Sequence, residues 1–366
     1  MARLFCCLHM RCTAAHSQRR VVDKSAALAI VGAVTINPTR RLACLSRFRE
    51  TRTILALGIF FLLQHGNSLL AQDGKKVRMA YSAFSISFLN IFVARDAGLF
   101  KKHGIEAELI QMAGPLPVAA LASGEIDYLT GYTTGIVATG QGAPLKGIMI
   151  SLRKPPFYLI AESSVQRPAD LAGKRIGVDR IGSLQHLVAR LMLKQQGADP
   201  EKSIFIQTGS VSNTVTSLGQ GAVSAAILSG PHNVIMAQKG FRQIASADEL
   251  PAQFPTSGLV VNETKLKTDA ARIKSVIRVM LEATAFCRKE KNWTVNYIKE
   301  RWKLEPKTAQ IVYDQWLAIL TPDGKIGVKD MQEYFDLAYG QKQIPAPINV
   351  AAVTDYSLLD QVLAGK

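Results

Sequence analysis

Polar side chains that could hold a small molecule gather in four regions of the chain. Each region contains hydroxyl groups, and every region except the first also contains glycine. The regions are Tyr81–Ser85, Gly131–Gly135, Asp179–Ser183, and Gly209–Asn213 together with Ser229–His232. Hydroxyls and backbone N–H groups donate hydrogen bonds to polar or anionic groups of a ligand. The chemistry that these residue types favour is therefore binding of a small polar molecule.

Patterns that would indicate catalysis or a metal site are missing. After residue 72 the histidines are His103, His186 and His232, which lack metal-ligand spacing. No nucleophile elbow, Walker loop or dinucleotide fingerprint follows an expected strand. A lone cysteine, Cys287, excludes an intrachain disulfide from the same region. We therefore expect no catalytic residues, no metal and no cofactor.

The net charge of +16 does not indicate a nucleic-acid-binding protein. Residues 1–71 hold ten basic and two acidic residues, so half of the charge lies there. In residues 72–366 the basic side chains are dispersed and are not interleaved with aromatic rings, as a nucleic-acid surface would require. The small excess of positive charge in residues 72–366 indicates at most a mild preference for an anionic ligand.

Residues 1–71 are predicted to be a leader. Three arginines precede the apolar run Ile54–Leu63, whose ten residues would span only about 15 Å as a helix, against about 30 Å of hydrocarbon. A basic flank, a short apolar centre and the small residue Ala71 are typical of a secretory signal peptide over about residues 45–71. We expect a periplasmic protein that begins near Gln72 and, because no cysteine follows the run, carries no lipid anchor.

The part of the leader before the signal peptide has two interpretations. Residues 1–44 are rich in arginine and poor in acidic residues, which fits an organelle transit peptide. Alternatively, translation starts downstream and this stretch is never made. We favour the second interpretation.

An internal repeat predicts the fold class. Val77–Gly131 alternates strand, helix, strand, helix, strand, and Arg175–Gly230 repeats the series. The run Phe92–Arg95 corresponds to Leu187–Arg190. Two such units predict an α/β protein of two lobes, each a mostly parallel sheet flanked by helices.

The lobes are predicted to share the chain unequally. Lobe 1 comprises residues 75–165 and 258–366, and lobe 2 comprises residues 166–257. The chain would then cross twice, near residues 162–168 and 254–260, as a two-strand hinge. A helical C-terminal tail should pack on lobe 1, with helices over Trp293–Trp302, Ala309–Leu320, Lys329–Tyr339 and Thr354–Leu363.

A series of short motifs in register carries a family resemblance. They include Ala97–Glu106, Ala120–Asp127, Ala169–Val178 and Gly197–Pro200. Over roughly residues 76–290 the chain resembles the periplasmic solute-binding proteins of ABC transporters for nitrate, sulfonates, taurine and the thiamine pyrimidine precursor. The resemblance implies a type II periplasmic-binding-protein fold that closes on a small-molecule ligand, a monomer, and an ABC transporter permease as partner.

Two alternatives share this fold. One is a ligand sensor that works without a transporter. The other is an enzyme of thiamine-pyrimidine synthesis, whose cysteine-rich iron motif is missing here because Cys287 is the lone cysteine after residue 72. The ligand itself stays open between a small anion, such as a sulfonate or carboxylate, and a flat heterocycle.

In lobe 1 the candidate ligand contacts follow two strands, because ligands of open α/β sheets bind at the carboxyl ends of strands. Tyr81 and Phe84 could stack on a flat ligand and Ser82 could hydrogen-bond it, although Phe84 could instead be core packing. Thr133 and Thr134 lie in the loop that the resembled family uses, or else one of them caps a helix.

In lobe 2 the strongest candidate is Ser183. It is placed to cap the helix that begins at Leu184, and the N-terminal N–H groups of that helix would attract an anion. Leu184 is itself a candidate contact. Arg180 could add charge, or it is simply solvated. Ser210 could contact ligand or cap the next helix, and His232 follows a strand at the expected cleft.

Overall fold

The computed structural model describes residues 76–112, 114–250, 253–342 and 344–365. The predicted signal peptide, the stretch before it and the start near Gln72 lie outside the described residues. All described residues belong to one unit of the chain, Ser68–Lys366.

The first sheet combines four strands from the start of the described chain with a fifth strand that follows much later in the sequence. Its order is β2-β1-β3-β10-β4, in which β1 runs parallel to β2 and β3 and β10 runs antiparallel to β3 and β4. The strands are β1 (Lys76–Tyr81), β2 (Glu106–Gln111), β3 (Tyr128–Gly131), β4 (Leu145–Ile150) and β10 (Ser257–Asn262). The helical segments between them are η3 (Ile86–Phe88), α2 (Leu89–Asp96), α3 (Leu99–Lys102), α4 (Leu116–Ser123) and α5 (Tyr132–Gly140).

The second sheet repeats this arrangement, with the order β7-β6-β8-β5-β9. Its strands are β5 (Tyr158–Ala161), β6 (Arg175–Val178), β7 (Ile204–Gln207), β8 (Ala225–Leu228) and β9 (Arg242–Ser246). Its helical segments are η4 (Pro168–Leu171), α6 (Leu184–Gln195), η5 (Pro200–Lys202), α7 (Val211–Gly219), α8 (His232–Gln238) and η6 (Ala247–Glu249). The fourth strand in each order, β10 or β5, runs antiparallel to both of its neighbours. The repeat and the two-sheet fold class are confirmed.

The first predicted lobe boundary is wrong. Strand β5, which was assigned to lobe 1, pairs with β8 and β9 in the second sheet. Every residue of this short apolar strand is buried, and the sequence contains no local signal for its partner strands. The first crossing therefore lies before Tyr158 and not at residues 162–168.

The two crossing segments run beside each other. The N–H of Phe254 donates to the carbonyl oxygen of Arg153 at 2.7 Å, and the N–H of Ser151 donates to that of Ser257 at 2.7 Å. Strand β10 of the first sheet begins at Ser257, within the range predicted for the second crossing. Hydrogen bonds thus tie the two connections into one paired element.

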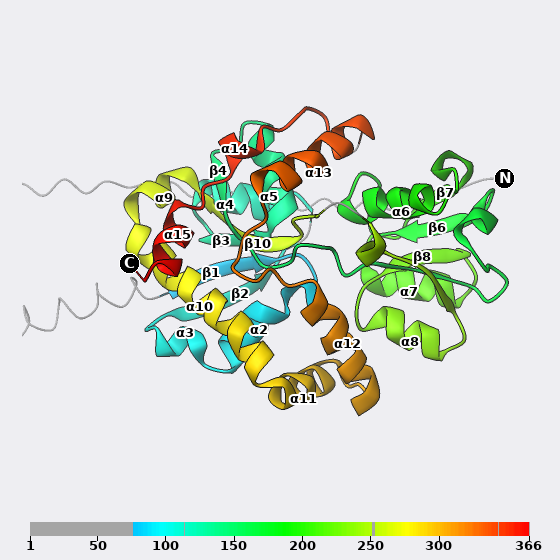
Figure 1. Cartoon of the computed structure of the whole chain (residues 1–366), viewed down its shortest axis with the longest axis horizontal. Coiled ribbons are helices and arrows are strands. Elements are labelled where there is room, and N and C mark those ends of the chain that lie inside the picture. The colour runs from blue at the N-terminus through cyan, green and yellow to red at the C-terminus, as the bar shows by residue number, and fades with distance from the viewer. Residues whose placement is uncertain (1–75, 113, 251–252, 343, 366) are drawn as a thin grey trace, which may run out of the picture. The chain divides into compact units, whose positions relative to one another are not determined.

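The C-terminal tail is helical, as predicted. Figure 1 shows these helices above, below and to the left of the first sheet. They are α9 (Glu263–Thr268), α10 (Ala270–Lys289), α11 (Lys291–Trp302), α12 (Pro306–Ala318), α13 (Val328–Gly340), α14 (Val350–Val353) and α15 (Ser357–Leu363). The predicted helix Thr354–Leu363 is wrong at its start, because Thr354 is extended and forms a bridge with Gly147. No helix in the described ranges has both the length and the apolar character needed to span a membrane.

Candidate functional site

Strand-end loops of the two sheets touch each other. Ser85 follows β1 of lobe 1, Ser229 follows β8 of lobe 2, and their Oγ atoms lie 3.3 Å apart. Both side chains are buried, at 7% and 3% exposure. A Cβ added to Gly230 would lie 3.3 Å from a methyl carbon of Ile86. The carboxyl ends of β1 and β8 therefore meet at a buried polar contact, which we call the lobe junction.

Tyr81 and Ser82 occupy the end of β1 as predicted. The Tyr81 ring packs edge-on against Phe92 at 5.1 Å between centroids and tilts toward Phe88 at 6.1 Å. It is half-buried, whereas Ser82 is exposed. Tyr81 thus has a fixed ring orientation, and Ser82 keeps its hydroxyl accessible.

Phe84 is not core packing. It is 39% exposed, and its ring lies 4.9 Å from that of Trp302 at an interplanar angle of 33°. The guanidinium carbon of Arg301 lies 4.8 Å from the centre of the Phe84 ring. Cation–π contact and ring packing therefore tie the loop after β1 to the end of α11.

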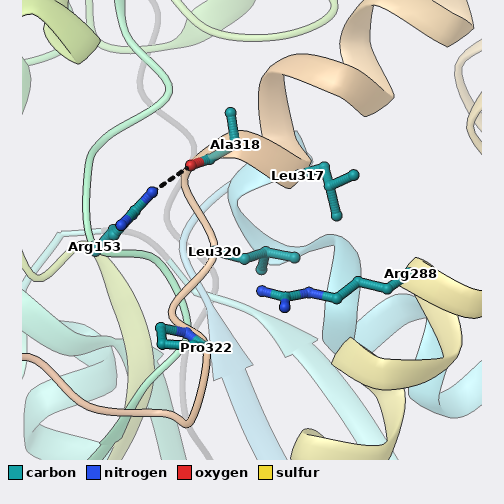
Figure 2. Close-up of a pocket in the computed structure, with 6 residues that line it drawn as sticks. All are labelled: Arg153, Arg288, Leu317, Ala318, Leu320 and Pro322. Carbon is teal, nitrogen blue, oxygen red and sulfur yellow. Dashed lines mark hydrogen bonds between the residues drawn. The ribbon is translucent and has the colours of Figure 1, made fainter.

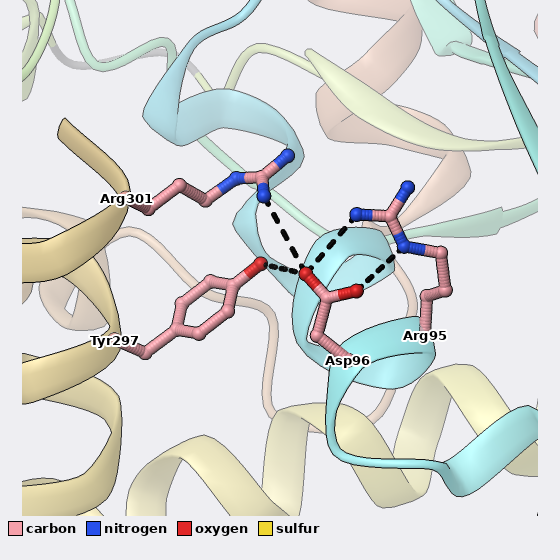
Figure 3. Close-up of polar contacts among 4 residues, drawn as sticks. All are labelled: Arg95, Asp96, Tyr297 and Arg301. Atoms are coloured by element: carbon pink, nitrogen blue, oxygen red, sulfur yellow. Dashed lines mark hydrogen bonds and ion pairs between the residues drawn. The ribbon is translucent and has the colours of Figure 1, made fainter.

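A carboxylate holds Arg301 in this place. Figure 3 shows Asp96 between Arg301, Tyr297 and Arg95. Asp96 Oδ2 lies 3.4 Å from Arg301 Nη1 and accepts a hydrogen bond of 2.5 Å from the Tyr297 hydroxyl. Burial alone would raise the pKa of Asp96, but hydrogen bonds from Arg95 and Tyr297 lower it below its ordinary value. The carboxylate is thus charged at neutral pH, and Arg301 keeps a counter-charge.

Thr133 and Thr134 lie in a helix and not in a loop. Helix α5 begins at Tyr132, and its N-cap, Gly131, has no side-chain capping bond, so the proposed cap by either threonine is wrong. The Thr133 hydroxyl donates to the carbonyl oxygen of Pro255 on the second crossing segment, whereas Thr134 is exposed. Thr133 therefore links lobe 1 to a crossing connection.

Ser183 caps α6, as predicted. Its Oγ accepts a hydrogen bond of 3.3 Å from the N–H of His186, and it donates to Asp179 Oδ1 at 2.5 Å. The same Asp179 oxygen accepts from the N–H of Arg180 at 2.7 Å. Arg180 is exposed and has no ion pair among the described residues, and Leu184 is half-buried against the apolar core.

The loop before Ser183 is already hydrogen-bonded. The N–H of Gly182 donates to Nδ1 of His186 at 3.1 Å, and that of Ile181 donates to Oε1 of Gln207 at 3.2 Å. An anion would therefore depend on the first-turn N–H groups of α6 and on Arg180, and the carboxylate of Asp179 would repel it.

The remaining two candidates differ in their surroundings. Ser210 is exposed and caps α7, since its Oγ accepts from the N–H of Asn213 at 3.2 Å. His232 begins α8 and is half-buried. Its Nδ1 atom is buried and has no hydrogen-bond partner among the described residues. Capping is thus confirmed for Ser210, and His232 keeps an unused ring nitrogen.

Sequence reasoning missed several buried polar residues near the lobe junction. The Nδ2 atom of Asn90 donates to Oγ of Ser151 at 2.9 Å, and that of Asn233 donates to Oε1 of Gln315 at 3.2 Å. Asn90, Ser151 and Asn233 are each at most 3% exposed. A polar residue within an apolar run, such as Asn90 in Phe88–Ala94, was the available signal.

Residues 85–292 match the protein family described as NMT1/THI5 like. The chain belongs to the NMT1/THI5-like family. A protein of Brucella abortus named as a candidate binding protein is 26% identical over 324 residues, which cover 84% of this chain and 98% of that protein.

Solved structures share the fold of this NMT1/THI5-like chain. The alkanesulfonate-binding protein SsuA of Xanthomonas axonopodis pv. citri, bound to MOPS, matches with a TM-score of 0.66 and 18% identity over 77% of this chain and 98% of that one. The periplasmic nitrate-binding protein NrtA of Synechocystis PCC 6803 matches with a TM-score of 0.67 and 13% identity over 80% and 89%. The fold is that of the periplasmic binding proteins.

The NMT1/THI5-like chain also has a pocket away from the candidate residues. It measures about 540 Å³ and is lined by Arg153, Arg288, Leu317, Ala318, Leu320 and Pro322 (Figure 2). Arg153 Nη2 donates to the carbonyl oxygen of Ala318 at 3.0 Å. The candidate ligand contacts do not line this pocket, so it is separate from the predicted site. Within the described ranges no three His, Cys, Asp or Glu side chains gather as a metal site requires.

Stability should depend on pH through His232. Burial lowers the pKa of His232 from its ordinary value of 6.5, so folding favours the neutral ring. Its contribution to stability is present above that value and is lost as pH falls, because the unfolded chain then binds the proton more readily. Urea titrations between about pH 7.5 and 5.5 should show a smaller loss of stability for His232→Gln than for the wild type. Parallel profiles for the two proteins would contradict this expectation.

Proposed function

We propose that this NMT1/THI5-like protein is an exported substrate-binding protein of an ABC importer. It captures a small organic or anionic solute between its lobes and delivers it to the membrane permease. The contact of Ser85 with Ser229 carries this proposal. This contact brings together loops at the carboxyl ends of strands from both sheets. Open α/β sheets bind ligands at these strand ends.

The proposed mechanism is rotation of the lobes about the paired crossing segments. Arg153 and Phe254 join these segments, and Thr133 bonds to Pro255 beside them. A ligand that touches both lobes stabilises the closed state only through its higher affinity for that state. Binding without turnover is sufficient for this role, so we propose no catalytic residue.

Candidate contacts supply two kinds of recognition. Tyr81 and Phe84 offer aromatic faces in lobe 1, where Ser82 can hydrogen-bond the ligand. In lobe 2, Ser183 and Arg180 lie at the start of α6, beside the carboxylate of Asp179. A flat heterocycle would engage the first set, and a sulfonate or carboxylate would engage the second set on the side away from Asp179.

The cellular setting follows from the same role. Periplasmic relatives of this fold, together with the signal-peptide pattern of residues 45–71, support export. We propose that the exported protein is a monomer without a lipid anchor and that it meets its permease in the ligand-bound state.

Native mass spectrometry of the protein, expressed from the full chain and gently purified from a periplasmic extract, tests this function. We expect a co-purifying small molecule, and MOPS and nitrate serve as added probes for the anionic class. Replacing Ser82, whose hydroxyl is exposed at the end of β1, with alanine should weaken binding of the retained molecule about tenfold, the order expected for a hydrogen bond lost from a bound polar group. Ser212→Ala, on the exposed start of α7, is the control. Turnover of the molecule, or equal affinity in both variants, would contradict the proposal.

A further inference from the structure

Helix α12 of the C-terminal tail is bonded to lobe 2. Gln238 Nε2 of α8 donates to Thr308 Oγ1 of α12 at 2.7 Å, and Asn233 Nδ2 of α8 donates to Gln315 Oε1 at 3.2 Å. Thr308 and Asn233 are each 2% exposed. Two side-chain hydrogen bonds, nearly two turns apart along α12, thus join helices that belong to different lobes.

An apolar contact lies between these two bonds. Val312 of α12 is 1% exposed, and a Cβ added to Gly230 of lobe 2 would lie 3.2 Å from it. Val234 of α8 is buried in the same apolar cluster. Thr308, Val312 and Gln315 follow the i, i+4, i+7 spacing of one helix face. One continuous face of α12 therefore covers α8 and the loop before it.

The remaining contacts of α12 anchor it to lobe 1. Trp316 and Tyr313 are fully buried in the cluster that contains Leu89 and Val93 of α2. The Tyr313 hydroxyl donates to the carbonyl oxygen of Cys287 in α10 at 3.0 Å. Helix α12 is thus a fixed part of lobe 1 that reaches lobe 2 through a mixed polar and apolar face.

We infer that Thr308 and Gln315 are positioning residues of a latch that holds α8, and with it the loop Ser229–His232, against lobe 1. A packed interface has discrete arrangements and does not deform continuously. Hinge motion must therefore either break the contact between α12 and α8 or leave it intact. The latch therefore sets the balance between lobe arrangements before any ligand arrives. Its link to ligand capture rests on the proposed function.

The contact can be weakened without disturbing either sheet. Thr308→Val and Gln315→Met remove the two hydrogen bonds and keep the approximate side-chain volumes. Without Gln315, the amide of the buried Asn233 loses its partner in the latched arrangement, while separated lobes would let water bond it. Gln238 is exposed and can bond water in either arrangement. The ratio of separated to latched molecules should rise about tenfold in the double variant.

Distances between spin labels on the two lobes test the latch in protein that has been unfolded in urea, dialysed to remove any co-purified molecule, and refolded. Labels at Ser123→Cys on α4 and Ser212→Cys on α7 use exposed positions. Burial raises the pKa of the Cys287 thiol to about 12, so it should not label. The cysteines before residue 72 are replaced by serine. We expect one main distance with the wild-type latch and a second, strongly populated distance in the double variant.

Two further variants make the result specific. Thr308→Ser keeps the hydroxyl and should preserve the single distance. Gln310→Met removes a bond to Asp314 within α12 itself and should also leave the distance unchanged. If the double variant only lowers the melting temperature while its distance distribution matches that of Gln310→Met, the contact is merely structural and the latch is refuted. Because no ligand is present, a failure of ligand binding would contradict the proposed function and leave this result intact.

Discussion

Gly258→Ala is expected to lower the free energy of unfolding by about 3 kcal/mol or more, at the upper end of overpacking effects. A Cβ on Gly258 would lie 2.0 Å from the carbonyl oxygen of Met149 and 2.9 Å from the Cα of Ile150. Strand β10 lies between β3 and β4, so the backbone cannot move aside without breaking a ladder. Urea denaturation followed by circular dichroism measures the change.

A second glycine of the chain provides the control. Gly219 ends α7, and no atom lies within 4 Å of a Cβ added there. Gly219→Ala should change stability by less than about 1 kcal/mol, with a gain as the expected sign in a helix. Wild-type stability of Gly258→Ala, or an equal loss in both variants, would show that the approach of β10 to β4 is not as described.

Ser229→Leu should separate the lobes and leave each of them folded. Ser229 is 3% exposed and touches Ser85 across the lobe junction, so a larger side chain has no space there. Rotation about the crossing segments relieves this overpacking, whereas a sheet core has no such freedom. The latched population should fall about a hundredfold, the equivalent of roughly 2.7 kcal/mol. The spin-label distances measure this population.

Two control variants distinguish separation of the lobes by the larger side chain from general destabilisation of the protein. Ser229→Ala fits the space and should keep the wild-type distance. Thr216→Leu, on an exposed face of α7, adds an apolar group away from the junction and should also keep it. If Ser229→Leu unfolds the protein while Thr216→Leu does not, the junction is a rigid core and the lobes are not free to rotate there.

The local pattern of the sequence was sufficient for the repeated units. The start of α6 at Leu184 and its capping serine Ser183 are features of residues close together in the chain, and both were predicted. Ser210 was predicted to cap or to bind for the same reason, and it caps α7. Short-range hydrogen bonds and helical periodicity decide such features, so a sequence window contains their causes.

Other features depended on partners distant in the chain. Strand β5 is a short apolar run that fits either sheet, and only pairing with β8 and β9 assigned it to lobe 2. Phe84 was a candidate for the core until packing placed it on Trp302. A short apolar segment does not specify which strand edge it joins, because the hydrophobic effect has no direction.

By itself the sequence determined the α/β class, the repeat and the helical tail. These follow from side-chain periodicity and capping, which act within a few residues. Tertiary structure alone decided that Ser85 meets Ser229 and that α12 bonds to α8. The residues in those contacts are far apart in the chain, and no local sequence pattern indicates that they meet. Close packing of the whole chain brings them together.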